Sequence, residues 1–221
     1  MADDELLDHI DADGARIGIA TRREVHARGL WHRTLHLWLV TPEEGGSLLY
    51  QLRSAAAANS PGLLDASVAG HLLAGESYRD ALRESDEEIG ISVPPEAVIA
   101  LGERREEHPD PAGGWNRELQ GVHITRLDPA WGRFDAVDHE AAGLFRIGAD
   151  AGARLHRGEV ASILCDALLA EEGGVRTVRR AVTLRDFVPR AGYYRRMHAI
   201  AARLIRGEPA EMLARAYGHD D

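Results

Sequence analysis

The chain has 221 residues, and its 26 basic side chains are all arginine because the sequence contains no lysine. Its formal net charge of −10 argues against nucleic acid as the main partner, since phosphate contacts require a basic face. The absence of lysine excludes a P-loop lysine and a Schiff-base lysine, whereas arginine still binds phosphate through its planar guanidinium. The 44% hydrophobic content is ordinary for a globular chain with one core.

No segment predicts a membrane span or a targeting peptide. No window contains the roughly 18 consecutive apolar residues that a membrane span requires. The N-terminus, MADDELLDHI, is acidic and lacks the apolar stretch of a signal peptide. The single cysteine, Cys165, excludes an internal disulfide, so we expect a cytoplasmic protein without a membrane partner. Cys165 lies in an apolar pattern, and we expect it to be a buried small hydrophobe.

The N-terminal part of the chain predicts strands separated by turns. In order, the patterns indicate two short strands around an Asp-Gly turn, a short helix or loop, a strand–turn–strand hairpin and a loop. Their ranges are 5–19, 21–30, 33–54 with the turn at 43–46, and 55–65. Pro61 and Gly62 mark the last of these as a connection.

A helix follows and is expected to end at Ile89. Ser77 is the predicted N-cap, and Asp80 stands three residues later in a position similar to that of a capping box. Gly90 is expected to terminate the helix.

Beyond Gly90 the patterns indicate further strands and C-terminal helices. The expected elements are strands over 97–104, 119–128 and 140–148, a loop over 106–118, an amphipathic helix over 158–172, a connector over 177–192, and two helices within 193–217 broken near Gly207 and Pro209. Strands mixed with helices predict an α+β sandwich.

The helix before Gly90 carries an unusual concentration of negative charge. Glu84, Glu87 and Glu88 stand at positions i, i+3 and i+4, which share one helix face. Their repulsion costs helix stability, and a hard divalent cation with oxygen ligands would remove that cost. A solvated acidic face is the alternative that these three residues leave open. Gly70 and Gly75 bracket the preceding loop, where glycine lets the backbone approach a ligand closely.

From residue 70 to residue 91 the sequence resembles the Nudix box. The family pattern is Gly, five residues, Glu, seven residues, and then Arg-Glu-aliphatic-x-Glu-Glu-x-Gly-aliphatic. The matching positions are Gly70, Glu76, Arg83, Glu84, Glu87, Glu88, Gly90 and Ile91. The resemblance implies a Nudix α/β/α sandwich, which we expect over residues 1–176. A connector and a helical extension over 177–221 are expected to pack on it, with a homodimer surface as an alternative role.

The box departs from the family pattern at two places. Six residues, not seven, separate Glu76 from Arg83, and Ser85 occupies the aliphatic position. One residue corresponds to about 100° of helix rotation, so a deletion inside the helix would turn Glu76 away from Arg83. A deletion at the start of the helix would keep them facing. These departures favour the alternative of a catalytically weak or inactive Nudix-fold binding or regulatory protein.

The flanking segments resemble the branch of the family that includes isopentenyl-diphosphate isomerase. They are GLWHRTLHLWLV, LLYQLRS, PGLLDASVAGH and NRELQGVHI. The isomerases carry a catalytic cysteine where this chain has Ala69, so we expect a hydrolase and not an isomerase. His36, His71 and Glu118 fall where isomerase metal ligands occur, whereas Asn116 and Gly29 replace two others. The apolar surroundings of His36 favour a core histidine over a ligand.

The resemblance implies hydrolysis of a diphosphate linkage in a small nucleotide-linked or isoprenoid-like molecule, with Mg²⁺ or Mn²⁺. The implied metal ligands are the Gly70 carbonyl and the carboxylates of Glu84, Glu87 and Glu88. Glu87 or Glu88 is the first candidate for the general base, and Glu118 and Glu140 are loop alternatives.

Four further residues have supporting roles in this hypothesis. Arg83 would orient the glutamates. Arg53 would contact the diphosphate, a task that suits the guanidinium fork, with a surface ion pair as the alternative. His71 would contact a phosphate or cap the loop, and Trp115 would stack on a flat group of the substrate or lie at the rim of the site.

Overall fold

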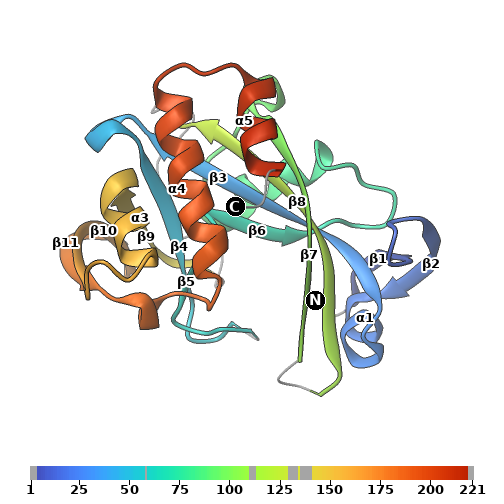
Figure 1. The fold of residues 1–221 in the computed structure, drawn as a ribbon. Coiled ribbons are helices and arrows are strands. Elements are labelled where there is room, and N and C mark those ends of the chain that lie inside the picture. The colour runs from blue at the N-terminus through green and yellow to red at the C-terminus, as the bar shows by residue number, and fades with distance from the viewer. Residues whose placement is uncertain (1–3, 58, 110–112, 129–133, 135–140, 219–221) are drawn as a thin grey trace.

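The computed structural model describes residues 4–57, 59–109, 113–128, 134 and 141–218 (Figure 1). The strands are β1 Leu6–Ile10, β2 Arg16–Thr21, β3 Trp31–Thr41, β4 Ser47–Arg53, β5 Leu64–Asp65, β6 Val68–His71, β7 Ile99–Pro109, β8 Trp115–Arg126, β9 Ala141–Gly148, β10 Ile163–Glu171 and β11 Gly174–Val182. The α-helices are α1 Arg22–Arg28, α2 Arg83–Ile89, α3 Ala149–His156, α4 Ala191–Ile205 and α5 Ala210–Gly218.

The sheet opens between its two central strands. β3 and β4 form the expected hairpin but pair at only two positions next to the turn, Val40 with Leu48 and Thr41 with Ser47. The short strands β5 and β6 fill the opening, with β5 on β4 and β6 on β3. The Ser67 hydroxyl ties the two sides together by accepting from the Leu39 amide and donating to a β4 carbonyl. The opening therefore places β6, and Gly70 on it, inside the sheet.

Helices cover both faces of this sheet. Successive side chains on a strand point to opposite faces, so β3 sends Trp38 to one apolar cluster and Leu37 and Leu39 to the other. The first cluster also contains apolar residues of α3, α4 and α5, and α4 and α5 lie across the sheet in Figure 1. The second contains Ile89 of α2. This arrangement confirms the sandwich that the sequence indicated.

The C-terminal helices belong to the main core. β11 spans residues 174–182, so the expected boundary at residue 176 falls inside a strand. The apolar side chains of the two helices are buried against the sheet: Tyr194, Met197, Ile200, Leu213 and Tyr217. The side chains that suggested a homodimer surface are thus used within this chain.

The prediction of a helix over residues 158–172 is wrong. Residues 163–171 form strand β10, which pairs with β9 and β11, and the nearest helix is α3, earlier in the chain. An ion pair of 2.7 Å between Arg146 and Asp166 supports the pairing of β9 with β10. Short apolar runs do not distinguish a strand from a helix by periodicity, and the neighbouring strands decide the outcome. Cys165 is buried, as expected.

The prediction of a loop over residues 106–118 is also wrong for most of that range. β7 and β8 extend through it as a hairpin in which Glu106 faces Glu118 and His108 faces Asn116. Polar residues on both faces hide the alternation that would have revealed these strands. The extension matters for function because it carries the Glu106 and Glu118 carboxylates over the opening in the sheet.

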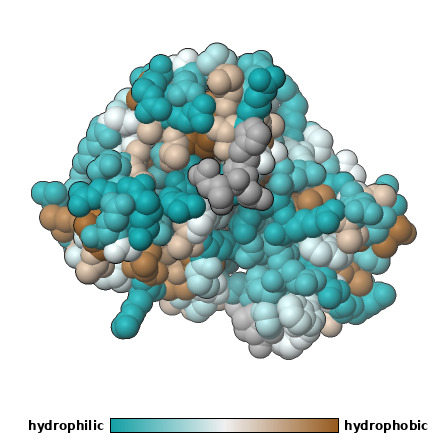
Figure 2. All heavy atoms as spheres, in the orientation of Figure 1, coloured by the Kyte–Doolittle hydropathy of each residue, from teal (hydrophilic) through white to brown (hydrophobic). Residues whose placement is uncertain are grey.

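No helix in the described part of the chain is long and apolar enough to cross a membrane. Hydrophilic residues cover most of the face seen in Figure 2.

Two buried histidines, His156 at the end of α3 and His198 in α4, predict a loss of stability in acid. Burial lowers the pKa of His156 to about 4 and that of His198 to about 3, whereas an unfolded histidine titrates near 6.5. As the pH falls from about 6.5 to 4, the unfolded chain binds protons that the folded chain does not. Each histidine should therefore lower the free energy of unfolding by about 1.4 kcal/mol per pH unit in this interval.

Urea denaturation at pH 7.5, 5.5 and 4.5 measures this dependence. His156→Phe should reduce it, because neither ring nitrogen of His156 has a hydrogen-bond partner in the described structure and phenylalanine preserves the aromatic contact with Phe187. Equal pH dependence in the variant and the parent would contradict the assignment.

Candidate active site

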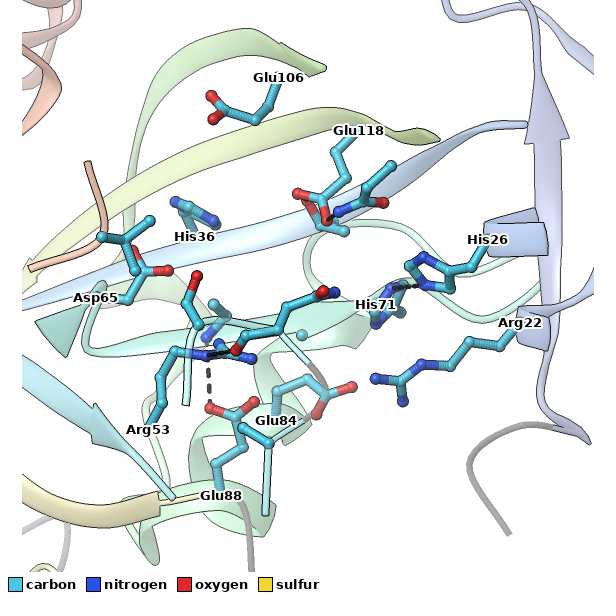
Figure 3. Close-up of a pocket in the computed structure, with 18 of the residues that line it drawn as sticks. Arg22, His26, His36, Arg53, Asp65, His71, Glu84, Glu88, Glu106 and Glu118 are labelled. Atoms are coloured by element: carbon cyan, nitrogen blue, oxygen red, sulfur yellow. Dashed lines mark hydrogen bonds between the residues drawn. The ribbon is translucent and has the colours of Figure 1, made fainter. Parts of the chain in front are cut away.

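A polar cavity of about 1100 Å³ lies where the sheet opens. Figure 3 shows Glu84 and Glu88 on one side of it, Glu118 on the opposite side, and His26 and His71 at one end. Its walls come from α1, β3, β5, β6, α2, the hairpin β7–β8 and the segment before α4. The cavity therefore brings together residues from nearly the whole length of the chain.

The shortened Nudix box keeps its central ion pair. A 3-10 turn, Asp80–Leu82, precedes α2, and Ser77 and Asp80 exchange the expected capping hydrogen bonds before it. The Nε of Arg83 lies 2.9 Å from Glu76 Oε1. The missing residue is therefore absorbed at the start of the helix, and Glu76 still faces Arg83.

Arg83 organises the carboxylates around it. Its Nη1 lies 2.8 Å from Glu84 Oε1 and 2.7 Å from Glu87 Oε2, and its Nη2 donates to the His71 carbonyl at 3.4 Å. Glu76 in turn accepts from the Leu73 amide at 2.8 Å, which fixes the loop before the helix. One guanidinium thus connects the loop, the helix and β6.

Gly70 leaves room for the carboxylate of Glu84. A Cβ at position 70 would lie 2.4 Å from Glu84 Cδ, so any other residue here would displace that carboxylate. Burial, opposed by Arg83 and assisted by nearby Glu87, raises the pKa of Glu84 to about 7. A buried carboxylate in this state is stabilised by an added positive charge.

Glu88 is held by different partners from those of Glu84. It is buried and accepts from the Gln51 side chain at 3.0 Å and from the Ala69 amide at 3.4 Å. Glu87, by contrast, has a side chain that is 53% exposed. The three predicted ligands all line the cavity with Gly70, but among the described residues their oxygens do not converge into a group of three. Carboxylate oxygens, such as those of Glu84 and Glu88 beside β6, are the kind of ligand that a hard divalent cation takes.

A second group of candidate ligands lies at the other end of the cavity. One nitrogen from each of His26, His32 and His71 lies within 4.8 Å of the others. His32 Nδ1 lies 3.1 Å from the Leu30 carbonyl and must carry its hydrogen there, while the buried Nε2 has no hydrogen-bond partner in the described structure. Burial lowers the pKa of His32 to about 4 and that of His71 well below 6.5, which leaves both neutral at pH 7.

Three converging imidazoles suit a transition metal. We expect the protein to bind one Zn²⁺ or Mn²⁺ through this group, and His32→Ala to remove it. Metal content after dialysis, measured by mass spectrometry, tests this expectation. His9→Ala is the control, because His9 lies on β1 and is not among the cavity residues. Unchanged metal content in His32→Ala would contradict it.

Glu118 faces this histidine group. It is the register partner of His32 in the parallel pairing of β3 with β8, and it accepts from Asn116 at 2.6 Å and from Thr34 at 3.3 Å. Although burial opposes ionisation, the pKa of Glu118 lies well below its usual range, because positive charge on His32 and His71 in acid, the Arg190 guanidinium and a hydrogen bond from Gln120 all favour the carboxylate. A carboxylate with so low a pKa is a poor proton acceptor near pH 7, so Glu118 is better suited to holding positive charge than to general-base catalysis.

The other predicted residues have different positions. Arg53 lines the cavity, and its Nε donates to the Asn59 carbonyl at 2.8 Å. Trp115 is 45% exposed, is not among the cavity residues and packs against Gly29 at the end of α1. Glu140 lies outside the described residues.

His36 is not part of the histidine group. Its ring is buried and its Nδ1 lies 3.2 Å from the Tyr193 hydroxyl, which also accepts from Trp38 at 2.8 Å. These contacts match the expectation of a core histidine, although His36 is also one of the residues that line the cavity. The residue pattern of the sequence did not single out His26 and His32. Alternation along β3 puts His32 on the same face as His36, and this signal could have identified His32.

Comparison with known proteins gives the family. No family model matches the chain. An uncharacterized Nudix hydrolase of Clostridium acetobutylicum is 31% identical over 196 residues, which cover 87% of this chain and 95% of that protein. The chain belongs to the Nudix hydrolase family. An uncharacterized Nudix hydrolase of Streptomyces coelicolor is 42% identical over 90 residues, covering 40% of this chain and 49% of that protein.

Two further matches agree with the resemblance to the isomerase branch and with the fold. The isopentenyl-diphosphate Delta-isomerase of Streptomyces coelicolor is 36% identical over 131 residues, covering 56% of this chain and 64% of the isomerase. The crystal structure of DR0079 from Deinococcus radiodurans superposes with a TM-score of 0.50 at 24% identity, over 70% of this chain and 90% of that one. This Nudix hydrolase thus shares sequence with isomerases but has Ala69 in place of their cysteine.

Proposed function

We propose that this Nudix hydrolase cleaves a diphosphate linkage in a small molecule, with Mg²⁺ or Mn²⁺ held by Glu84 and Glu88. The observation that carries the proposal is the intact Arg83 network: Arg83 pairs with Glu76 despite the shortened box and orients Glu84 beside Gly70. A box that had lost its function would have no need to preserve a buried carboxylate of raised pKa.

The chain's own residues would bind and orient the substrate around this metal. The bound cation would neutralise diphosphate oxygens and lower the pKa of a water molecule. Arg53 would bind a phosphate oxygen from its place in the cavity wall. Glu87, the most exposed of the three glutamates, would accept the proton of the attacking water, and Arg83 would hold its carboxylate in place.

The cavity wall favours a polar substrate over an isoprenoid one. Among the described residues, the apolar members of the lining are small side chains and one proline: Ala27, Ala56, Ala57, Ala69, Val188 and Pro189. A prenyl chain gains about 25 cal/mol per Å² from apolar contact, and the described lining residues include no leucine, isoleucine, methionine, phenylalanine, tyrosine or tryptophan to provide it. We therefore favour a nucleotide-linked or similarly polar diphosphate.

The test is a substrate panel in which chromatography measures the phosphate-bearing products, here called phosphate release, because cleavage of a diphosphate linkage between two groups yields two phosphate monoesters and no free phosphate. The panel contains nucleoside triphosphates, nucleotide sugars, dinucleotides and isopentenyl diphosphate, each with Mg²⁺ or Mn²⁺. We expect metal-dependent release from a nucleotide derivative, and Glu87→Gln should remove it without loss of folding. Glu96→Gln is the matched control, because Glu96 is exposed and outside the cavity.

The alternative function has a distinct signature. Metal binding without release from any member of the panel would favour a binding or regulatory protein. Full turnover in Glu87→Gln would reject the role of Glu87 as the base.

A further inference from the structure

The segment that leads into α4 closes one end of the cavity. Val188, Pro189 and Arg190 all line it, although they lie about a hundred residues beyond the Nudix box. The segment is anchored to β5, because the Val188 amide donates to the Leu64 carbonyl at 3.0 Å. The C-terminal part of the chain therefore contributes directly to the wall of the site.

Arg190 is held rigidly in this wall. Its Nη1 lies 3.1 and 3.0 Å from the two carboxylate oxygens of Asp65, and its Nε lies 3.0 Å from Glu106 Oε1. The Tyr194 hydroxyl donates to Asp65 Oδ1 at 2.9 Å, and Arg104 pairs with Glu106. The side chain of Arg190 is only 10% exposed. Two carboxylates, each with a second partner, thus fix the orientation of one guanidinium.

This network leaves one nitrogen of Arg190 available. The hydrogen bonds of Arg190 within the described residues use Nε and Nη1, and none of them uses Nη2. A guanidinium has five N–H donors, so Nη2 can still donate to a ligand in the cavity that Arg190 lines. A structural ion pair alone would not require the residue to border the cavity.

The charges around Arg190 indicate what it would bind. Asp65 and Glu106 offset the positive charges of their partners Arg190 and Arg104, so this ion-pair network has no excess positive charge. Another phosphate here would be repelled by the two carboxylates, whereas a neutral oxygen would accept from Nη2 without that penalty. Hydroxyl and carbonyl oxygens are such acceptors.

We propose that Arg190 is a specificity-determining residue that donates from Nη2 to a hydroxyl or carbonyl oxygen of the group attached to the substrate's diphosphate. The inference rests on the proposed function, since it assumes that the diphosphate binds beside Glu84 and Glu88. Through this hydrogen bond, Arg190 selects diphosphates that carry a sugar-like group over those that carry a plain hydrocarbon.

Binding of two probes tests the proposal. ADP-ribose carries hydroxyl groups next to its diphosphate, and inorganic pyrophosphate carries none. Their dissociation constants are measured by calorimetry with Mg²⁺ in Glu87→Gln, where slow turnover keeps the probes intact. The same measurements are made after Arg190→Lys is added to Glu87→Gln. Lysine keeps a positive charge beside Asp65 but lacks the Nη2 donor. We expect about tenfold weaker binding of ADP-ribose, as for the loss of one charged hydrogen bond, and a change below about twofold for pyrophosphate.

Tyr194→Phe is the structural control. It removes a hydrogen bond from the same Asp65, but Tyr194 is not among the cavity residues, so the substitution should lower the thermal midpoint without changing the affinity for either probe. Equal weakening of both probes by Arg190→Lys, or weakening of neither, would overturn the proposal. A parent protein that does not bind ADP-ribose would overturn it as well.

The experiment separates this inference from the proposed function. Selective weakening of ADP-ribose binding, in a protein whose wild type releases no phosphate from any substrate, would support Arg190 while the hydrolase proposal fails. Phosphate release that is equally sensitive to Arg190→Lys for every substrate would leave the hydrolase standing and reject the specificity role.

Discussion

Replacing Glu84 by glutamine is expected to lower metal-dependent phosphate release by more than about a hundredfold, since loss of even an outer partner of a metal ligand costs 10- to 100-fold. Glutamine keeps the shape that fits over Gly70 but removes the charge that a divalent cation requires. The stability of the metal-free protein should not fall, because the substitution also removes the repulsion between Glu84 and Glu87. Phosphate release and the thermal midpoint, each with and without Mg²⁺, are the measurements.

The pattern of the two measurements is what identifies a metal ligand. Mg²⁺ should raise the thermal midpoint of the parent and of Glu96→Gln, but not that of Glu84→Gln, because a ligand stabilises only the state that binds it. A Glu84→Gln protein that retains turnover and the midpoint shift would show that the metal binds elsewhere.

Replacing Asp65 by asparagine is expected to lower the free energy of unfolding by about 3–5 kcal/mol, the range for breaking a buried ion pair by removing one partner. Asp65 is buried, pairs with Arg190 through both oxygens and accepts from the Tyr194 hydroxyl. Asparagine has nearly the same size, so the loss should come from the charge of Arg190 and not from a cavity. Chemical denaturation near pH 7 measures it.

An exposed ion pair provides the comparison for Asp65. Asp13 lies 3.2 Å from Arg105, but its side chain is almost fully in solvent. Asp13→Asn should therefore change the denaturation midpoint little, because water screens exposed pairs. Similar effects of the two substitutions would show that the Asp65–Arg190 pair is not a special element of the core.

The local features of the box were readable from the sequence because they depend on residues a few positions apart. Ser77 and Asp80 exchange the expected hydrogen bonds, but the prediction of Ser77 as the N-cap is wrong, because α2 begins at Arg83 with Leu82 as its N-cap. Gly90 ends α2 as predicted, in the left-handed conformation with φ of 70°. The sequence left open where the missing residue is absorbed; the 3-10 turn before Arg83 answers that question. Ser85 is buried, and its hydroxyl has no partner in the described structure, in agreement with its departure from an aliphatic position.

The histidine group and Arg190 could not be read in the same way. His32 meets Glu118 through a parallel strand pair that joins residues 86 positions apart in the sequence, and no local pattern specifies such a pairing. β10 was expected as a helix for a related reason: its apolar run fits either element, and its neighbours β9 and β11 decide.

By itself, the sequence determined the family, the carboxylate-bearing helix and the absence of a cysteine at position 69, because these follow from residue identity and short-range spacing. Only the tertiary structure decided that Glu84 lies against Gly70, that His26, His32 and His71 converge, and that Arg190 from the C-terminal segment completes the cavity. These contacts join segments that are distant in the chain, and the packing of the whole sheet, rather than any local preference, brings them together.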